Sequence, residues 1–256
     1  MNHQPECQER AMRTTLLLAL ITLVLLSSMS EAAPPEYIAM KTGCPMVMDG
    51  ILNEPAWQKA KSVGPFSFPW DTFWGPKQQT EAKILWDNER IYFSFTCEDK
   101  DIWALHYNHF SAVSYSDCCE VFISPVPEGK ERLDYLNYEI NCIGTWLLGY
   151  HAPSRGKNFY WKDVSGIEIG RVINGSCNYS ADTDERWVLE FSIPYSYFHE
   201  FGATFPPEDG QVVWLNLNRC DHIVNQYSQW SPNKEKRSFH SPEDFGKVIF
   251  STKILK

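Results

Sequence analysis

Apolar and polar residues alternate with a period of two through four segments of the chain, 91–97 (IYFSFTC), 136–142, 187–193 and 212–218 (VVWLNLN). Because successive side chains of a strand point to opposite faces of a sheet, this period predicts strands that are half buried. Apolar runs at 82–86, 121–124, 167–173 and 247–251 predict further strands. Clusters of Pro, Gly, Asp and Asn between the segments indicate turns. The chain is therefore predicted to consist mainly of strands.

Helical patterns are rare in this sequence. One short helix is predicted over 54–60, with Asn53 as its N-cap and Pro55 in its first turn. Another turn or two is expected after Pro194. We therefore expect an all-β fold, an antiparallel β-sandwich of jelly-roll type with one or two short helices.

The first 32 residues have the three parts of a secretory signal peptide. Arg10 and Arg13 precede an apolar run at 16–26, and small residues follow at Ser30 and Ala32. The run is shorter than the roughly 20 residues that span a bilayer, and the small residues fit cleavage after Ala32. A retained membrane anchor is the alternative. We expect a signal peptide over 1–32, a single domain over 33–256, and a secreted, extracellular protein that does not insert into a membrane after cleavage.

The formal net charge is −9, and the chain has no long run of Lys and Arg. This charge makes nucleic acid and anionic membrane surfaces poor partners. Aromatic residues form 14% of the chain, so a large core is available, and most of these rings are expected to lie in it. Flat rings stack on the apolar faces of sugars, so the aromatic content favours sugar binding.

Seven cysteines follow the predicted signal peptide, at positions 44, 97, 118, 119, 142, 177 and 220. In an oxidising compartment they allow at most three disulfides and leave one thiol over. Cys118 and Cys119 are neighbours and point to opposite faces of a strand, so we expect them to have different partners. The absence of a C-x-x-C pair disfavours zinc. Two glycosylation sequons begin at Asn174 and Asn178 in a polar segment.

The polar faces of the predicted strands carry carboxylates and amides. They include Glu120, Asn137, Glu139, Asn141, Asn216 and Asn218. An ordinary solvated face is one interpretation, although such faces more often carry Lys, Thr and Ser. The other interpretation is a ligand-binding face, because carboxylates and amides can make paired hydrogen bonds to vicinal hydroxyls.

Seven stretches, in this order, resemble carbohydrate-binding module family 9 and the wider group of family-9-like secreted β-sandwich proteins. They are 49–60 (DGILNEPAWQKA), 82–102 (AKILWDNERIYFSFTCEDKDI), 117–125 (DCCEVFISP), 135–141 (YLNYEIN), 182–198 (DTDERWVLEFSIPYSYF), 206–221 (PPEDGQVVWLNLNRCD) and 227–250, which starts YSQWSP and ends HSPEDFGKVIF. The opening Asp-Gly…Asn-Glu…Trp and the closing Trp-Ser-Pro…Phe-Gly are the strongest pair. The stretches cover nearly the whole chain after the leader.

The resemblance implies non-catalytic binding of a saccharide held between two aromatic rings, in association with carbohydrate catabolism. Glu120 and Asn141 fall on the hydrogen-bonding positions of the family, and Phe239 falls on one of the two aromatic positions. The second aromatic position falls at Ser114, with Tyr115 or Phe110 as stand-ins, and Glu139 replaces an Arg. Trp230 is a further candidate ring. The expected carbohydrate-binding residues are therefore Glu120, Glu139, Asn141, Tyr115, Trp230 and Phe239.

The resemblance also implies structural calcium. Asp99, Asp117 and Asp221 fall on acidic positions of the family near strand ends, and calcium prefers hard oxygen ligands from several loops. The alternative is that these aspartates are ordinary exposed loop residues.

Three rival functions remain open on the sequence alone. Glu120 and Glu139 could form a glycosidase pair, which would require carboxyl groups about 5 Å or about 6.5–9.5 Å apart across a cleft. A haem site could draw on Met40, Met46, Met48, His106, His109 and His151. A purely structural or protein-binding role is the third. No nucleophile motif such as G-x-S-x-G is present, and no catalytic residue is assigned.

Overall fold

The computed structural model describes residues 33–70, 75–126, 132–160, 166–202, 204–233 and 237–255. The predicted signal peptide lies outside the described residues. Residues Pro34–Lys256 form one compact unit. Its strands are β1 (Glu36–Thr42), β2 (Thr80–Trp86), β3 (Arg90–Glu98), β4 (Cys118–Ser124), β5 (Tyr135–Asn141), β6 (Trp146–Ala152), β7 (Lys157–Tyr160), β8 (Glu168–Asn174), β9 (Arg186–Pro194), β10 (Val212–Asp221), β11 (Gln226–Gln229) and β12 (Gly246–Leu255).

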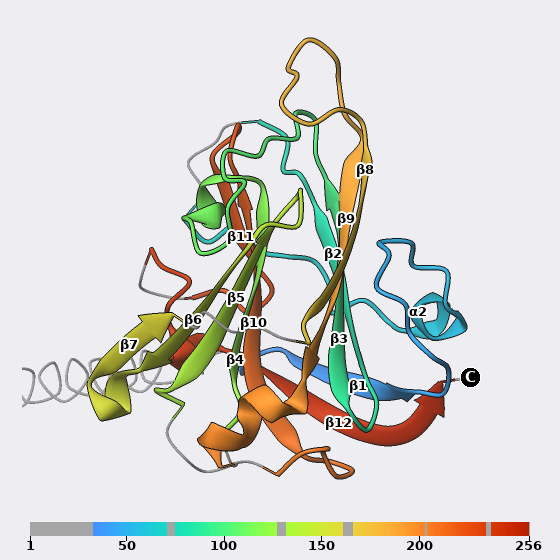
Figure 1. The fold of residues 1–256 in the computed structure, drawn as a ribbon, viewed down its shortest axis with the longest axis vertical. Coiled ribbons are helices and arrows are strands. Elements are labelled where there is room, and N and C mark those ends of the chain that lie inside the picture. The colour runs from blue at the N-terminus through green and yellow to red at the C-terminus, as the bar shows by residue number, and fades with distance from the viewer. Residues whose placement is uncertain are drawn as a thin grey trace, which may run out of the picture. The chain divides into compact units, whose positions relative to one another are not determined.

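The strands are hydrogen-bonded in the order β7-β6-β5-β4-β10-β12-β1-β2-β3-β9-β8, and β11 pairs with β10. Figure 1 shows β4, β5, β6 and β10 as one group and β2, β3, β8 and β9 as another, with β1 and β12 crossing the lower part of the view. The pairs of β1 with β12 and with β2 are parallel, whereas the other pairs are antiparallel. The all-β sandwich is confirmed, with these two parallel pairs as a departure from a purely antiparallel arrangement.

The main core lies between the two groups of strands. It contains the inward-facing residues that the period of two predicts, such as Phe93 and Phe95 on β3, Phe191 on β9, and Leu215 on β10. The rings of Phe93 and Phe191 stack with centroids 5.2 Å apart. Burial of large apolar side chains contributes roughly 1.5–3 kcal/mol each and fixes which face of each strand points inward.

A second apolar cluster covers the outer face of β2 and β3. Trp57 of helix α2 (Pro55–Lys59) is fully buried there, and its indole N–H donates to Glu190 Oε1 at 2.6 Å. The other oxygen of Glu190 accepts from the backbone N–H of Asp49 and Gly50. Burial raises the pKa of Glu190 to about 7. One carboxylate on β9 therefore fastens the segment before α2 to the sandwich.

The predicted helix is present but begins one residue later than expected. Glu54, rather than Asn53, holds the N-cap position, and it makes no side-chain cap. Its carboxylate instead accepts a hydrogen bond from the backbone N–H of Val47 at 3.1 Å. The turn expected after Pro194 is the 3-10 helix η3 (Tyr195–Phe201). No helix of the described residues is long and apolar enough to span a membrane.

The seven described cysteines carry free thiols, and some of these thiols lie close to one another. Cys97 and Cys119 face each other in the core, with Sγ atoms 3.4 Å apart. Cys118 lies on the opposite face, in register with Cys220 on β10. The predicted divergence of Cys118 and Cys119 is therefore correct, because each lies beside a different cysteine.

Candidate functional site

The outer face of β4, β5 and β10 carries the predicted row of carboxylates and amides. Glu120 on β4 lies in register with Glu139 on β5 and with Asn218 on β10. This face is not solvated as an ordinary sheet face would be, because the 3-10 helix η1 (Val113–Tyr115) and the segment around Phe239 lie over it. They enclose a pocket of about 560 Å³, within the roughly 300–1,000 Å³ of small-molecule sites.

Three aromatic rings form one wall of the pocket. The ring centroids of Trp70 and Phe239 are 5.1 Å apart, those of Trp70 and Tyr227 are 6.3 Å apart, and those of Tyr227 and Phe239 are 6.2 Å apart. Tyr115 also lines the pocket from η1, and its side chain is 64% exposed. An apolar wall of aromatic rings and one accessible ring are suited to the apolar face of a ring-shaped ligand.

Two carboxyl groups form the inner end of the pocket. Glu120 is 3% exposed and Glu139 is 6% exposed. Glu120 Oε1 accepts from the thiol of Cys220 at 3.6 Å, and Glu139 Oε1 accepts from Asn137 Nδ2 at 2.7 Å. The Oε2 atom of each is buried and has no hydrogen-bond partner. Neither of these two oxygens is satisfied by a hydrogen bond from the described residues.

Burial determines the protonation of this pair. It raises the pKa of Glu120 well above the ordinary range, and the negative charge of Glu139 adds to the effect. Burial also raises the pKa of Glu139 to about 7, opposed by the hydrogen bond from Asn137. Near neutral pH the pair can therefore both donate and accept hydrogen bonds.

A second row of side chains holds Glu139 in place. Asn137 donates to Glu139, and its Oδ1 lies 3.0 Å from His151 Nε2. Gly149 on β6 lies opposite Asn137, and a Cβ atom there would collide with Asn137 Oδ1. Glycine at this position therefore leaves room for the amide that orients Glu139.

The structure brings four of the six predicted carbohydrate-binding residues together, namely Glu120, Glu139, Tyr115 and Phe239. Asn141 does not line the pocket, and its amide instead donates to His106 O and accepts from Thr145 N at 2.8 Å each. Trp230 belongs to the core, where its indole donates to Val63 O and its ring lies over Gly246. The structure therefore gives no support for ligand contact by Asn141 or Trp230.

Trp70 and Tyr227 are pocket residues that the sequence reasoning missed. Trp70 belongs to an aromatic-rich loop whose position follows from no periodic pattern. Tyr227 lies on the short strand β11 in register with Cys220, which is itself in register with Cys118 on β4. The side chain of Tyr227 is therefore on the same sheet face as that of Glu120. The one available signal was the run of aromatic residues at 66–74. Phe110, the other suggested stand-in, packs edge-on against Trp146.

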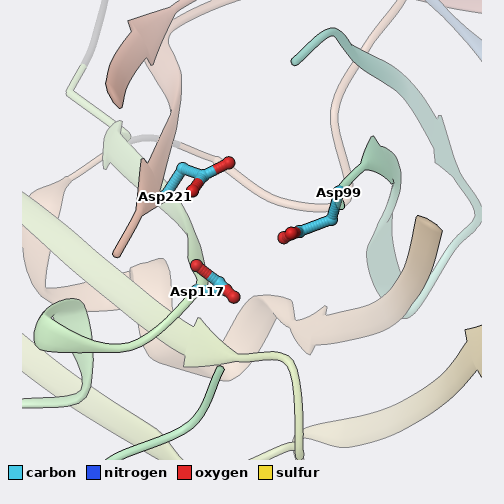
Figure 2. Close-up of side chains that lie close together, drawn as sticks. All are labelled: Asp99, Asp117 and Asp221. Atoms are coloured by element: carbon cyan, nitrogen blue, oxygen red, sulfur yellow. The ribbon is translucent and has the colours of Figure 1, made fainter. Parts of the chain in front are cut away.

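The three predicted metal ligands are close together. Asp99 follows β3, Asp117 precedes β4 and Asp221 ends β10, and Figure 2 shows these three side chains near one another. Each offers a carboxylate oxygen within 4.8 Å of the others, and all three side chains are buried. The three aspartates are therefore not the ordinary exposed loop residues of the alternative interpretation.

Arg219 lies beside these aspartates and balances part of their charge. Its guanidinium is 1% exposed and contacts Asp99 Oδ2 at 3.0 Å and Asp221 Oδ2 at 2.9 Å. Three carboxylates and one guanidinium leave a net charge of −3 + 1 = −2 when all are ionised. Asp221 Oδ1 is buried and has no hydrogen-bond partner. The charge, the oxygen ligands and this unpartnered atom fit a divalent cation.

The geometry bears on the rival functions as well. Glu120 and Glu139 lie side by side on neighbouring strands, at positions where Cβ atoms are about 4.5–5.5 Å apart, so they share one wall. Glycosidase carboxyls instead flank the scissile bond.

The candidate haem ligands are dispersed: Met40, Met46 and Met48 pack beside α2, His109 stacks on Trp146, and His151 stacks on Tyr135.

The two sequon asparagines lie in and after β8. Asn174 is the last residue of β8. Asn178 accepts from the Ala104 N–H and donates from Nδ2 to Ala104 O at 3.0 Å and to the Tyr107 hydroxyl at 2.6 Å. A glycan on Asn178 would remove one of these two donated bonds, because glycosylation replaces one hydrogen of Nδ2. Occupancy of both sequons stays a prediction.

Comparisons with known proteins agree with this architecture. Residues 53–250 match the profile of Carbohydrate-binding family 9, and the chain therefore belongs to that family. The sequence has no significant match among curated proteins.

Solved structures share the fold at low sequence identity. One is a Bacteroides uniformis ATCC 8492 protein for which carbohydrate binding has been suggested, with 19% identity, TM-score 0.68, and coverage of 86% of this chain and 100% of that one. A family 9 module from Caldicellulosiruptor kristjanssonii has been solved with glucose (14% identity, TM-score 0.54, coverage 85% and 96%) and with cellotriose (14%, 0.55, 85% and 94%).

Proposed function

We propose that the pocket binds the end of a saccharide chain without cleaving it. The observation that carries the proposal is the cluster of Trp70, Tyr227 and Phe239 beside two buried carboxyl groups with unpartnered oxygens. An apolar wall with few precisely placed polar groups is typical of small-molecule sites. Glucose and cellotriose bound to the Caldicellulosiruptor module support the same class of ligand for this chain.

Each part of the pocket has a distinct role in this proposal. The aromatic wall covers the apolar face of the sugar ring and excludes water. Glu120 and Glu139 exchange hydrogen bonds with neighbouring hydroxyls, which fixes the orientation of the sugar. Because both carboxyls lie on one wall, they grip the sugar from one side. This arrangement supports binding rather than hydrolysis.

A glycan array, followed by titration of the best ligand, tests the proposal. We expect Phe239→Ala to weaken affinity at least tenfold, because the ring is part of the enclosed wall. Tyr179→Ala is the matched control, since Tyr179 is an exposed aromatic residue that does not line the pocket. An array with no hit in the presence of calcium, or equal affinities of wild type and Phe239→Ala, would contradict the proposal. Glu120→Gln provides a second variant if Phe239→Ala fails to fold.

Calcium at the aspartate cluster is a second part of the proposal. Asp99, Asp117 and Asp221 would hold the ion and join β3, β4 and β10, so its role would be structural. A ligand that binds only the folded state at 100 times its Kd stabilises by about 2.7 kcal/mol. We expect the unfolding midpoint to rise in calcium relative to chelator, and Asp117→Asn to remove the rise. Equal midpoints in calcium and chelator would exclude a stabilising ion.

Export and a role in carbohydrate catabolism complete the proposal. The charge, apolar run and small residues of 1–32 support secretion. N-terminal sequencing of protein from the medium should begin at Ala33. Protein that is retained in the cell with an intact Met1 would contradict export.

A further inference from the structure

The inner end of the pocket is acidic. Glu120 and Glu139 lie side by side on β4 and β5, and the buried Oε2 atom of each has no hydrogen-bond partner among the described residues. Among the described lining residues, the one Arg or Lys is Arg237, and its side chain is exposed at the rim with Tyr115. The buried carboxyls therefore have no buried cation beside them in the described part of the pocket.

The other titratable groups near the pair add no positive charge at neutral pH. The thiols of Cys118 and Cys220 and the phenol of Tyr227 carry no positive charge in either protonation state. Burial lowers the pKa of His240, which keeps its imidazole neutral. A positive charge at the inner end can therefore come from a ligand.

The pair holds protons that a cation can displace. Burial keeps both carboxyl groups partly protonated near neutral pH, with the pKa of Glu139 at about 7. A positive charge within about 4–6 Å favours the ionised form of a carboxyl group. A cationic ligand would thus lower the pKa of the pair and release a proton to solvent. A neutral ligand would leave the protons in place.

The aromatic wall suits the same charge. The faces of Trp, Tyr and Phe rings attract a cation within about 6 Å of the ring centroid, with Trp the strongest. Trp70, Tyr227 and Phe239 form a continuous group of such rings. The pocket therefore combines ring faces for cation–π contact with carboxylates for hydrogen bonds to an ammonium group.

We propose that the pocket selects a saccharide end that carries a primary ammonium group, a hexosamine, over the corresponding neutral sugar. The ammonium donates to the carboxyl groups of Glu120 and Glu139, which line the pocket, and the sugar ring lies against the aromatic wall. This inference rests on the proposed function and adds the class of sugar to it. N-Acetylation removes both the charge and two of the donors, so the acetylated sugar loses the advantage.

Three sugars that differ at one carbon test the inference. Glucosamine, glucose and N-acetylglucosamine are titrated into the protein at pH 7, below the pKa of about 8 that is usual for such amines. We expect glucosamine to bind at least tenfold more tightly than glucose. Calorimetry in buffers of different ionisation enthalpy should show release of a fraction of a proton with glucosamine and none with glucose.

Charge-removing variants assign the effect to the pair. Glu139→Gln keeps the size of the side chain and should reduce the preference for glucosamine over glucose to about twofold or less, whatever its effect on the affinity for glucose itself. Glu120→Gln should act in the same direction and serves if Glu139→Gln does not fold. Glu185→Gln removes an exposed carboxylate outside the pocket and should leave the preference unchanged.

The outcomes separate this inference from the proposed function. Glucose that binds as tightly as glucosamine, or a preference that survives in both pocket variants, would overturn the hexosamine inference alone. No binding of any of the three sugars and no hit on the glycan array would overturn the proposed function together with the inference. Tenfold tighter glucosamine binding with proton release would support both.

Discussion

Replacement of Arg219 by methionine should destabilise the protein strongly. The guanidinium is 1% exposed and contacts Asp99 and Asp221 at 3.0 and 2.9 Å. Methionine fills much of the apolar volume but removes the charge and the donors. With all three aspartates ionised, the net charge of the three aspartates and residue 219 then falls from −2 to −3. Removal of one partner of a buried ion pair costs about 3–5 kcal/mol, because the remaining charge stays buried without compensation.

Urea and thermal unfolding in chelator measure this effect. A change of 3–5 kcal/mol corresponds to a lower Tm of about 6–20 °C for a domain of this size, at roughly 2–4 °C per kcal/mol. Arg186→Met is the matched control, because Arg186 forms an exposed pair with Glu185 at 2.8 Å. Exposed pairs contribute about 0–1 kcal/mol, so this control should unfold almost as the wild type does.

One result would refute the reasoning about the aspartate cluster. That result is an Arg219→Met variant that unfolds within about 1 kcal/mol of wild type, as Arg186→Met is expected to do. The charges around Arg219 would then not be buried and coupled as the structure shows. Calcium offers a further check, since a divalent cation should recover part of the stability of Arg219→Met by replacing the lost positive charge.

Three further predictions concern other parts of the sandwich. The pKa of Glu190 is raised from 4.5 to about 7, so its protonated form favours folding and the free energy of unfolding should fall as the pH rises from about 4.5 to about 7. In urea titrations Glu190→Gln should remove roughly 3 kcal/mol of that fall. A fall of equal size in wild type and Glu190→Gln would contradict this prediction. Cys97 and Cys119 should form a disulfide when the protein refolds with oxidised glutathione, each bridge releasing two glutathione thiols; mass spectrometry that finds both alkylated under denaturing, non-reducing conditions would exclude it. Gly149→Ala should displace Asn137 and weaken sugar affinity, with an unchanged affinity as the contradicting result.

The strands that the sequence predicts correctly are those with one face in the core. The sequences of β3, β9 and β10 alternate because one face of each strand packs in the core, although most side chains on the opposite face are covered as well. β1 was missed, since its place depends on parallel pairing with β12 far along the chain. β7 was missed because it has four residues and pairs only with β6 in the described sheet.

The candidate site divides in the same way. Glu120 and Glu139 could be found because a period of two places them on the polar face of regular strands. Trp70 could not, since a loop brings it to Phe239 and no local pattern specifies that contact. Trp230 was expected to contact ligand but belongs to the core, because the absence of a side chain at Gly246 makes room for its ring. No local sequence pattern predicts this contact.

The central claim is that a saccharide lies against the aromatic wall of this pocket. The indole N–H signals in a ¹H–¹⁵N NMR titration with cellotriose or glucosamine test it most directly, with Trp70→Phe used to assign the Trp70 signal. We expect the Trp70 signal to shift with ligand concentration, while the signals of the core residues Trp57, Trp86, Trp187 and Trp230 stay in place. A ligand that binds without moving the Trp70 signal, or that moves the core signals instead, would contradict the claim.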